Sequence, residues 1–232
     1  MLARLRNKHL GSSLGSILFY EIIRSGTTLG LTILFGFRRR GSRRLPARGP
    51  VLVVANHQSY LDPPLIGCAM PQRQFDFLAR AGLFDVGWLR PLITALHSVP
   101  IKESGSDPAS IKEILRRLEE GRVVLVFPEG SRTLDGDMGA FKRGVALLLK
   151  RARCPVLPVG IAGAYDAWPR GSKPRLFGKR VVVEIGEPIG YDELMADGAD
   201  GALARLRSEV SELVQSAESL RGSGHHPQRR QR

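Results

Sequence analysis

The chain has 232 residues, of which 43% are hydrophobic and 25% are charged, so it can bury one sizeable core and a single domain is expected. Its net charge of +13 lies at the two ends, because residues 1–48 hold ten Lys or Arg against one acid and residues 221–232 hold four against none. Subtracting these from the totals of 35 and 22 leaves 21 basic and 21 acidic residues in residues 49–220. A neutral body without interleaved basic and aromatic residues argues against a nucleic-acid partner.

The N-terminal arm surrounds an apolar stretch at residues 14–37, which favours a lipid surface as its partner. Its uncharged part between Arg24 and Arg38 has 13 residues. As a helix this part would be roughly 20 Å long against a hydrocarbon core of about 30 Å, which is too short to span. We expect two amphipathic helices, divided at residues 26–28, that lie in the interface of an anionic membrane. The alternative is a pair of core helices in a soluble fold.

Three regions follow from this charge distribution. Residues 1–48 are expected to be a basic, amphipathic membrane-associating segment. Residues 49–220 form the main domain, and residues 221–232 form a disordered basic tail.

A short apolar strand is predicted at residues 51–55, and polar residues follow directly at its end. His57 and Asp62 are five residues apart, about 140° apart on a regular helix and on opposite faces of a strand, so only a turn can bring them together. Because Pro63 and Pro64 disfavour helical geometry in the residues before them, the next helix is expected to begin near Pro64 and to leave Asp62 free to reach His57. Such a pair is a general base with its orienting carboxylate. The alternative is a structural histidine followed by a helix-capping aspartate.

Strands alternate with helices along the rest of the chain, which predicts an α/β domain with a mostly parallel central sheet flanked by helices. Strands or extended pieces are expected at residues 74–79, 98–102, 123–127, 155–161 and 181–185. Helices are expected near residues 64–69, 82–96, 108–120, 142–150 and 192–220, with a loop at 164–180. Cys68 and Cys154 are both in apolar surroundings, which is typical of buried thiols in a reducing compartment, and metal-ligand spacing is absent from the sequence.

A second polar cluster follows the predicted strand at residues 123–127 and consists of Glu129, Gly130, Ser131 and Arg132. Glycine allows close backbone approach, and arginine can bind a phosphate through two parallel hydrogen bonds. Glu129 would fix the guanidinium or a substrate hydroxyl. Taken alone, the cluster also fits a surface turn with a local ion pair.

The segment Asn-His-Gln-Ser-Tyr-Leu-Asp at residues 56–62 resembles the first signature block of the glycerolipid acyltransferases, whose bacterial type is 1-acylglycerol-3-phosphate acyltransferase. Phe-Pro-Glu-Gly-Ser-Arg-Thr at residues 127–133 resembles the third block, with the family's phosphate-binding residues on Glu129 and Arg132. Residues 141–144 resemble the segment that follows it, and residues 156–159 resemble the fourth block.

The second block departs from the family pattern, because Glu103 stands where an arginine is usual, with Lys102 beside it. Arg80 falls where many members have a lysine thought to contact the acceptor phosphate. The resemblance implies Arg80 and Lys102 as auxiliary cations. It leaves open whether Glu103 selects an acceptor with an amine-bearing headgroup.

The resemblance implies an enzyme that transfers an acyl group from acyl-CoA or acyl-carrier protein to a lysophospholipid, with lysophosphatidate as the expected acceptor in phospholipid synthesis. His57 would be the general base and Asp62 its orienting group, without a cofactor, a metal or a covalent nucleophile. We expect the protein on the cytoplasmic face of the membrane, as a peripheral or monotopic protein. A non-catalytic lipid-binding protein of the same fold is the alternative.

Overall fold

The computed structural model describes residues 14–80, 98–101 and 108–222. Seven strands are present in this part of the chain: β1 (Arg38–Arg40), β2 (Val51–Ala55), β3 (Phe75–Arg80), β4 (Ser98–Ile101), β5 (Val123–Val126), β6 (Val156–Ala162) and β7 (Val182–Ile185). The helices described are α2 (Leu14–Phe35), α3 (Asp62–Ala69), α5 (Pro108–Glu119), α6 (Arg143–Ala152), α7 (Ala164–Ala167), α8 (Tyr191–Leu194) and α9 (Gly198–Gly222), with a short 3₁₀ turn at Ser42–Arg44.

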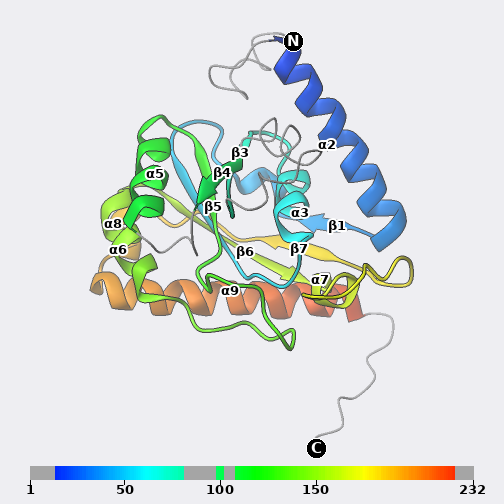
Figure 1. Ribbon diagram of the computed structural model, residues 1–232. Helices are drawn as coiled ribbons and strands as arrows, with labels where there is room; N and C mark the ends of the chain where they lie inside the picture. The colour runs from blue at the N-terminus through cyan, green and yellow to red at the C-terminus, as the bar shows by residue number, and fades with distance from the viewer. Residues whose placement is uncertain (1–13, 81–97, 102–107, 223–232) are drawn as a thin grey trace, which may run out of the picture.

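The strands form one sheet in the order β1-β7-β6-β2-β5-β3-β4 (Figure 1). All neighbouring strands run parallel except β6 and β7, which confirms the prediction of a mostly parallel α/β sheet. β2 lies at the centre, where Val53 is in register with Leu125 of β5 and Leu157 of β6. All five residues of β2 are buried, as the continuous apolar run predicted.

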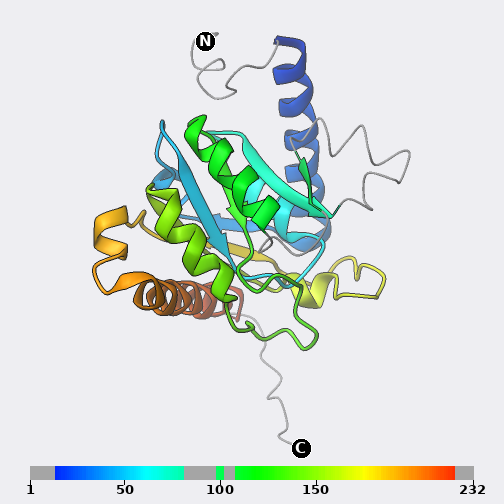
Figure 2. The same cartoon turned by 60° about the vertical axis from the view of Figure 1, so that its left-hand side comes forward.

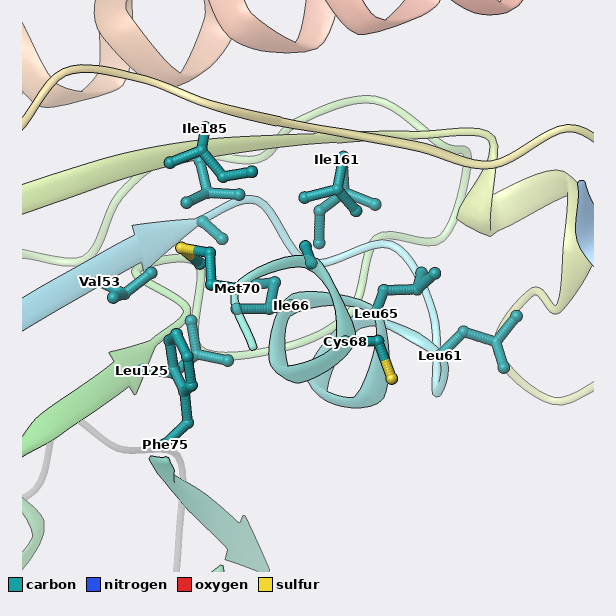
Figure 3. Close-up of a cluster of buried hydrophobic side chains, with 14 of the residues drawn as sticks. Val53, Leu61, Leu65, Ile66, Cys68, Met70, Phe75, Leu125, Ile161 and Ile185 are labelled. Atoms are coloured by element: carbon teal, nitrogen blue, oxygen red, sulfur yellow. The ribbon is translucent and has the colours of Figure 1, made fainter. Parts of the chain in front are cut away.

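Alternate residues of β2 enter two separate apolar layers, one on each face of the sheet. On one face Val51 and Val53 pack in a core with side chains of α3. Figure 3 shows Val53, Leu125, Ile161 and Ile185 converging on α3 side chains in this core. On the other face Leu52 and Val54 pack with residues of α5, α6 and α9. Figures 1 and 2 show these helices covering that face, while α2 lies along the opposite side of the molecule.

Helix α3 begins at Asp62, two residues before the start predicted near Pro64. Both prolines occupy the first turn, where a missing backbone N–H removes no intrahelical hydrogen bond and the fixed φ suits a helix. Leu61 already has right-handed helical geometry. The chain therefore turns between His57 and Leu61, before the prolines rather than at them.

The N-terminal region differs from the prediction of two helices. Helix α2 runs without interruption from Leu14 to Phe35, roughly 33 Å, and Glu21 and Arg24 form an ion pair of 2.6 Å within it. By length and composition its stretch Ile17–Phe35 is sufficient to cross a membrane, so the prediction that it is too short is wrong. The length of 13 residues counts only the part between Arg24 and Arg38. Arg24 is paired with Glu21 inside the helix, so its charge does not end the apolar stretch.

Arg38–Arg40 form the edge strand β1, which pairs with β7 and therefore joins the sheet. The sequence suggested only a basic arm here. The predicted strands and helices elsewhere in the described residues are confirmed within one to three residues, except that the closing segment is divided into α8 and α9 and the loop at 164–180 contains the short α7. The helix expected at residues 82–96 lies outside the described residues. Cys68 and Cys154 are buried and free, as predicted.

Candidate active site

The loop after β2 brings His57 and Asp62 together. Nδ1 of His57 lies 2.8 Å from Oδ2 of Asp62. The Asp62 side chain is fully buried, whereas the His57 side chain keeps 18% of its surface exposed. The carboxylate thus faces inward and holds Nδ1, which leaves Nε2 as the imidazole nitrogen available to a substrate.

Asp62 also fixes the backbone of the loop. Its Oδ2 accepts hydrogen bonds from the backbone N–H groups of Gln58 at 2.6 Å and Ser59 at 2.7 Å. Together with Nδ1 of His57, three donors thus converge on this one oxygen. The same group therefore orients the imidazole and shapes the turn that carries it.

Two further polar side chains of the loop have structural contacts. Asn56 is fully buried and exchanges hydrogen bonds with the backbone of Ile161, at 2.9 Å to its carbonyl and 2.8 Å from its N–H. The Ser59 hydroxyl donates to the carbonyl of Trp168 at 2.8 Å and accepts from the N–H of Leu61 at 3.1 Å. Because both the donor and an acceptor position of Ser59 are occupied, a nucleophilic role for this serine is disfavoured.

The imidazole of His57 stacks on Phe127, the first residue after β5. Their ring centroids are 4.0 Å apart and the planes differ by 12°. Asp62 and Phe127 together fix the ring in position and in plane. Phe127 was not identified as a site residue from the sequence, although it opens the segment that contains Glu129.

Glu129 ties the loop after β5 to the histidine loop. Its Oε1 accepts the backbone N–H of His57 at 2.7 Å, and its Oε2 accepts that of Gly139 at 2.9 Å. The backbone N–H of Thr133 in turn donates to the carbonyl of His57 at 2.9 Å. Burial raises the pKa of Glu129, although its two backbone hydrogen bonds oppose that shift. Each carboxylate oxygen thus accepts one backbone donor, which gives Glu129 a structural role in joining the two loops.

Gly130 allows a cationic side chain to cross the turn. Its φ is 71°, and a Cβ built there would lie 2.5 Å from Nζ of Lys142. Glycine suits this left-handed backbone conformation, and a Cβ at this position would require the Lys142 side chain to move. Ser131 is exposed beside it. Lys142 thereby lies next to the turn that carries Arg132.

Arg132 is attached to the histidine loop through an aromatic contact. Its Cζ lies 3.4 Å from the centroid of the Tyr60 ring, a cation–π geometry. Tyr60 in turn packs on Trp168, with ring centroids 5.3 Å apart. Within the described residues, Nη1 of Arg132 is buried and has no hydrogen-bond partner. An unused donor of a guanidinium that lies against the loop of His57 and Asp62 is a candidate contact for an anionic group.

Of the two auxiliary cations that the resemblance implies, Arg80 lies in the described part of the chain. Arg80 ends β3, with its backbone in register with Ile101 of β4, at the carboxyl edge of the sheet where β2 and β5 also end. Lys102 and Glu103 lie outside the described residues. Among the described residues, no group of three His, Cys, Asp or Glu side chains is arranged to hold a metal ion.

The site combines two parts: a histidine–carboxylate pair after β2 and a turn with an arginine after the neighbouring β5. These two parts are expected of a transferase that uses a general base and acts on an anionic substrate. The family model described as Acyltransferase matches residues 36–162, which include both parts. The chain belongs to this acyltransferase family, and its members are enzymes.

Individual relatives agree with this assignment. The 1-acyl-sn-glycerol-3-phosphate acyltransferase of Bacillus subtilis is 22% identical over 200 residues, which cover 86% of this chain and 97% of that protein. The chloroplastic enzyme of the same name from Brassica napus is 30% identical over 179 residues, but these are 74% of this chain and only 51% of the relative. The crystal structure of the 1-acyl-sn-glycerophosphate acyltransferase PlsC from Thermotoga maritima superposes with a TM-score of 0.76 at 24% identity, covering 98% of this chain and 88% of that chain. This likeness confirms the fold.

Proposed function

We propose that the protein transfers a fatty acyl group from acyl-CoA or acyl-carrier protein to the free hydroxyl of lysophosphatidate, which gives phosphatidate. The observation that carries the proposal is the 2.8 Å contact between His57 and Asp62 in a loop that is joined to Arg132 through Tyr60. This arrangement supports a base for the hydroxyl and a cation for the phosphate of one acceptor molecule.

The reaction needs two proton transfers, one from the acceptor hydroxyl to His57 and one from His57 to the departing thiolate. Nε2 of His57 takes the proton of the acceptor hydroxyl while its oxygen attacks the thioester carbonyl. The new C–O bond forms and the C–S bond breaks, and the proton passes from the imidazolium to the departing thiolate. Asp62 stabilises the imidazolium between these two transfers. The structural contacts of Ser59 favour this direct route over an acyl-enzyme intermediate.

The phosphate of the acceptor is assigned to Arg132, with Lys142 beside the same turn and Arg80 and Lys102 as auxiliary cations. Glu129 and Gly130 would support this site indirectly, by holding the turn in shape. Glu103 supports the competing acceptor, a lyso-lipid with an amine-bearing headgroup, because a carboxylate there would repel a phosphate and attract an ammonium.

We also propose that α2 lies in the interface on the cytoplasmic side of an anionic membrane. Its apolar residues at helical spacing, Ile17, Tyr20, Leu31 and Phe35, are buried against the domain. Its opposite face exposes Leu18, Phe19, Ile22, Leu29 and Ile33. The described exposed residues of α2 include no Asp, Glu, Lys or Arg. A helix that buries residues of one face near both of its ends while exposing an uncharged apolar face on the other side suits an in-plane position better than a crossing.

Purified full-length protein incubated with labelled acyl-CoA or acyl-carrier protein tests the proposal. Acceptors would be lysophosphatidate and lysophosphatidylethanolamine, and His57→Ala would be the blank. We expect transfer to lysophosphatidate that is lost in the blank. If the wild type prefers lysophosphatidylethanolamine and Glu103→Arg reverses this preference, the acceptor is the amine-bearing lipid and not lysophosphatidate. The proposed acyl-transfer reaction would then still hold. Binding of lipid without transfer to any acceptor would instead support the non-catalytic alternative.

A further inference from the structure

A basic loop at residues 169–180 connects α7 with β7, beyond the range that the family model matches. Its five basic residues, with no acid among them, are Arg170, Lys173, Arg175, Lys179 and Arg180. Figures 1 and 2 show the loop projecting from the body on the side where α2 ends. Because the body as a whole is neutral, this loop is a local concentration of positive charge.

The loop also exposes two large apolar side chains next to each other. Leu176 is 48% exposed and Phe177 is 63% exposed. Phe177 has a φ of 62°, a left-handed conformation that is unfavourable for a bulky residue. A large apolar side chain that is held mostly exposed on a left-handed backbone points to a contact outside the chain.

Hydrogen bonds fix this loop beside the end of α2. The backbone N–H of Phe177 donates to the carbonyl of Leu34 at 2.8 Å, and that of Val181 donates to the carbonyl of Phe35 at 3.0 Å. These bonds satisfy two of the last carbonyls of the helix, which have no intrahelical partner. Phe177 is thereby held next to the last turn of α2, where Ile33 is 62% exposed.

The same loop is attached to the candidate active site at its other end. The backbone N–H of Arg175 donates to the carbonyl of Ala167 at 2.7 Å. The next residue, Trp168, packs on Tyr60 and accepts the hydroxyl of Ser59 through its carbonyl. The loop therefore connects the end of α2 with the loop that carries His57.

We infer that the basic loop is a second membrane contact, which inserts Leu176 and Phe177 into the interface of an anionic bilayer while its lysines and arginines bind lipid headgroups. The inference rests on the proposed membrane-lipid acceptor. A bilayer fits the surface because anionic headgroups complement the five cations and the acyl region accepts the two apolar side chains. The contact would place the site next to the membrane that holds its acceptor.

A fluorescent label at position 177 tests this directly. The full-length Phe177→Cys variant would carry the environment-sensitive dye NBD, and since Cys68 and Cys154 are both buried, the new thiol is the accessible one among the described residues. The matched control is Leu147→Cys on α6, which is also exposed, at 42%, on the opposite face of the sheet. The probe is a vesicle of phosphatidylcholine with phosphatidylglycerol, compared with phosphatidylcholine alone.

We expect the emission at position 177 to rise and shift to the blue on the anionic vesicles, and the emission at position 147 to stay unchanged. In the unlabelled protein, Leu176→Ser with Phe177→Asn should weaken vesicle binding roughly tenfold, since asparagine tolerates the left-handed backbone. Co-sedimentation with vesicles while the label at position 177 remains in water would overturn the inference. Failure of the intact protein to bind vesicles would overturn it together with the role of α2. Loss of acyl transfer to lysophosphatidate, with insertion retained, would overturn only the proposed reaction.

Discussion

Oδ2 of Asp62 accepts a hydrogen bond from Nδ1 of His57 at 2.8 Å, and the backbone N–H groups of Gln58 and Ser59 donate to the same oxygen. The carboxylate is buried, so these donors replace the water that would otherwise solvate Oδ2, whereas Oδ1 is buried without a hydrogen-bond partner among the described residues. One oxygen atom thus sets the position of the base, its tautomer and the shape of the loop. The two residues act as one unit, which has consequences for how their substitutions combine.

Asp62→Asn is expected to lower kcat by about 10²- to 10⁴-fold, because a neutral amide stabilises the imidazolium less and can present its NH₂ group to Nδ1. The double variant His57→Ala/Asp62→Asn should be little slower than His57→Ala alone, since the loop that Asp62 also holds in shape no longer carries an imidazole. Steady-state rates of the three variants, with circular dichroism as the folding control, check this. Additive losses in the double variant would mean that Asp62 acts independently of His57.

Glu129→Gln should reduce kcat roughly tenfold or more, with a smaller change in the KM of either substrate. The amide would accept one of the two backbone N–H groups and direct its own NH₂ at the other, which would displace His57 or Gly139. Because the folded pKa of Glu129 is raised, its ionisation costs stability as the pH rises through that pKa. We therefore expect the variant to lose activity without a comparable fall in its Tm at neutral pH. A specific rise in the acceptor KM would show instead that Glu129 contacts the acceptor.

The central strands and the pairing of His57 with Asp62 could be predicted from the sequence, because both depend on residues that are close together in the chain. β1 could not be predicted, since three consecutive arginines at an edge carry no apolar alternation and join the sheet only through their register with β7. The contacts of Glu129 were missed for a related reason. They join residues 72 positions apart, and nothing near Glu129 in the sequence identifies His57 as its partner. Tyr60 lies inside the segment at residues 56–62 that resembles the first signature block. Its contact with Arg132 joins two loops that are far apart in the sequence, so only the structure shows it.

Substituting the exposed face of α2 should weaken membrane binding while the fold remains. Leu18→Gln, Ile22→Gln and Ile33→Gln change only exposed side chains, and together they are expected to lower vesicle affinity by at least tenfold. Deleting residues 1–48 is less informative, because it also removes β1 and the buried face of α2. Vesicle co-sedimentation measures the effect.

The matched control for this experiment is Leu31→Ala on the buried face of the same helix. It should lower the free energy of unfolding by about 2–5 kcal/mol but leave the vesicle affinity of the folded protein unchanged. The opposite pattern, with binding lost in the control and kept in the triple variant, would show that the buried face of α2 is the one that meets the membrane.

The contact between Tyr60 and Arg132 predicts that an aromatic ring sets the affinity for the acceptor. Tyr60→Leu removes the face on which the guanidinium lies, 3.4 Å from the ring centroid, and should raise the KM of lysophosphatidate by about 3- to 30-fold, the range expected for a partly buried cation–π contact. Tyr60→Phe keeps the face and should be close to wild type. The KM of the thioester should stay unchanged in both variants, because the contact concerns Arg132, the cation proposed to bind the acceptor phosphate.

A double-mutant cycle separates this role from a general effect on folding. Arg132→Lys keeps a positive charge but loses the planar, two-pronged donor, so it should also raise the acceptor KM. Since the aromatic ring acts through the guanidinium, Tyr60→Leu should cost much less in the Arg132→Lys background than in the wild type. Equal costs in the two backgrounds, or a parallel rise in the thioester KM, would show that Tyr60 affects the site by another route, such as its packing on Trp168.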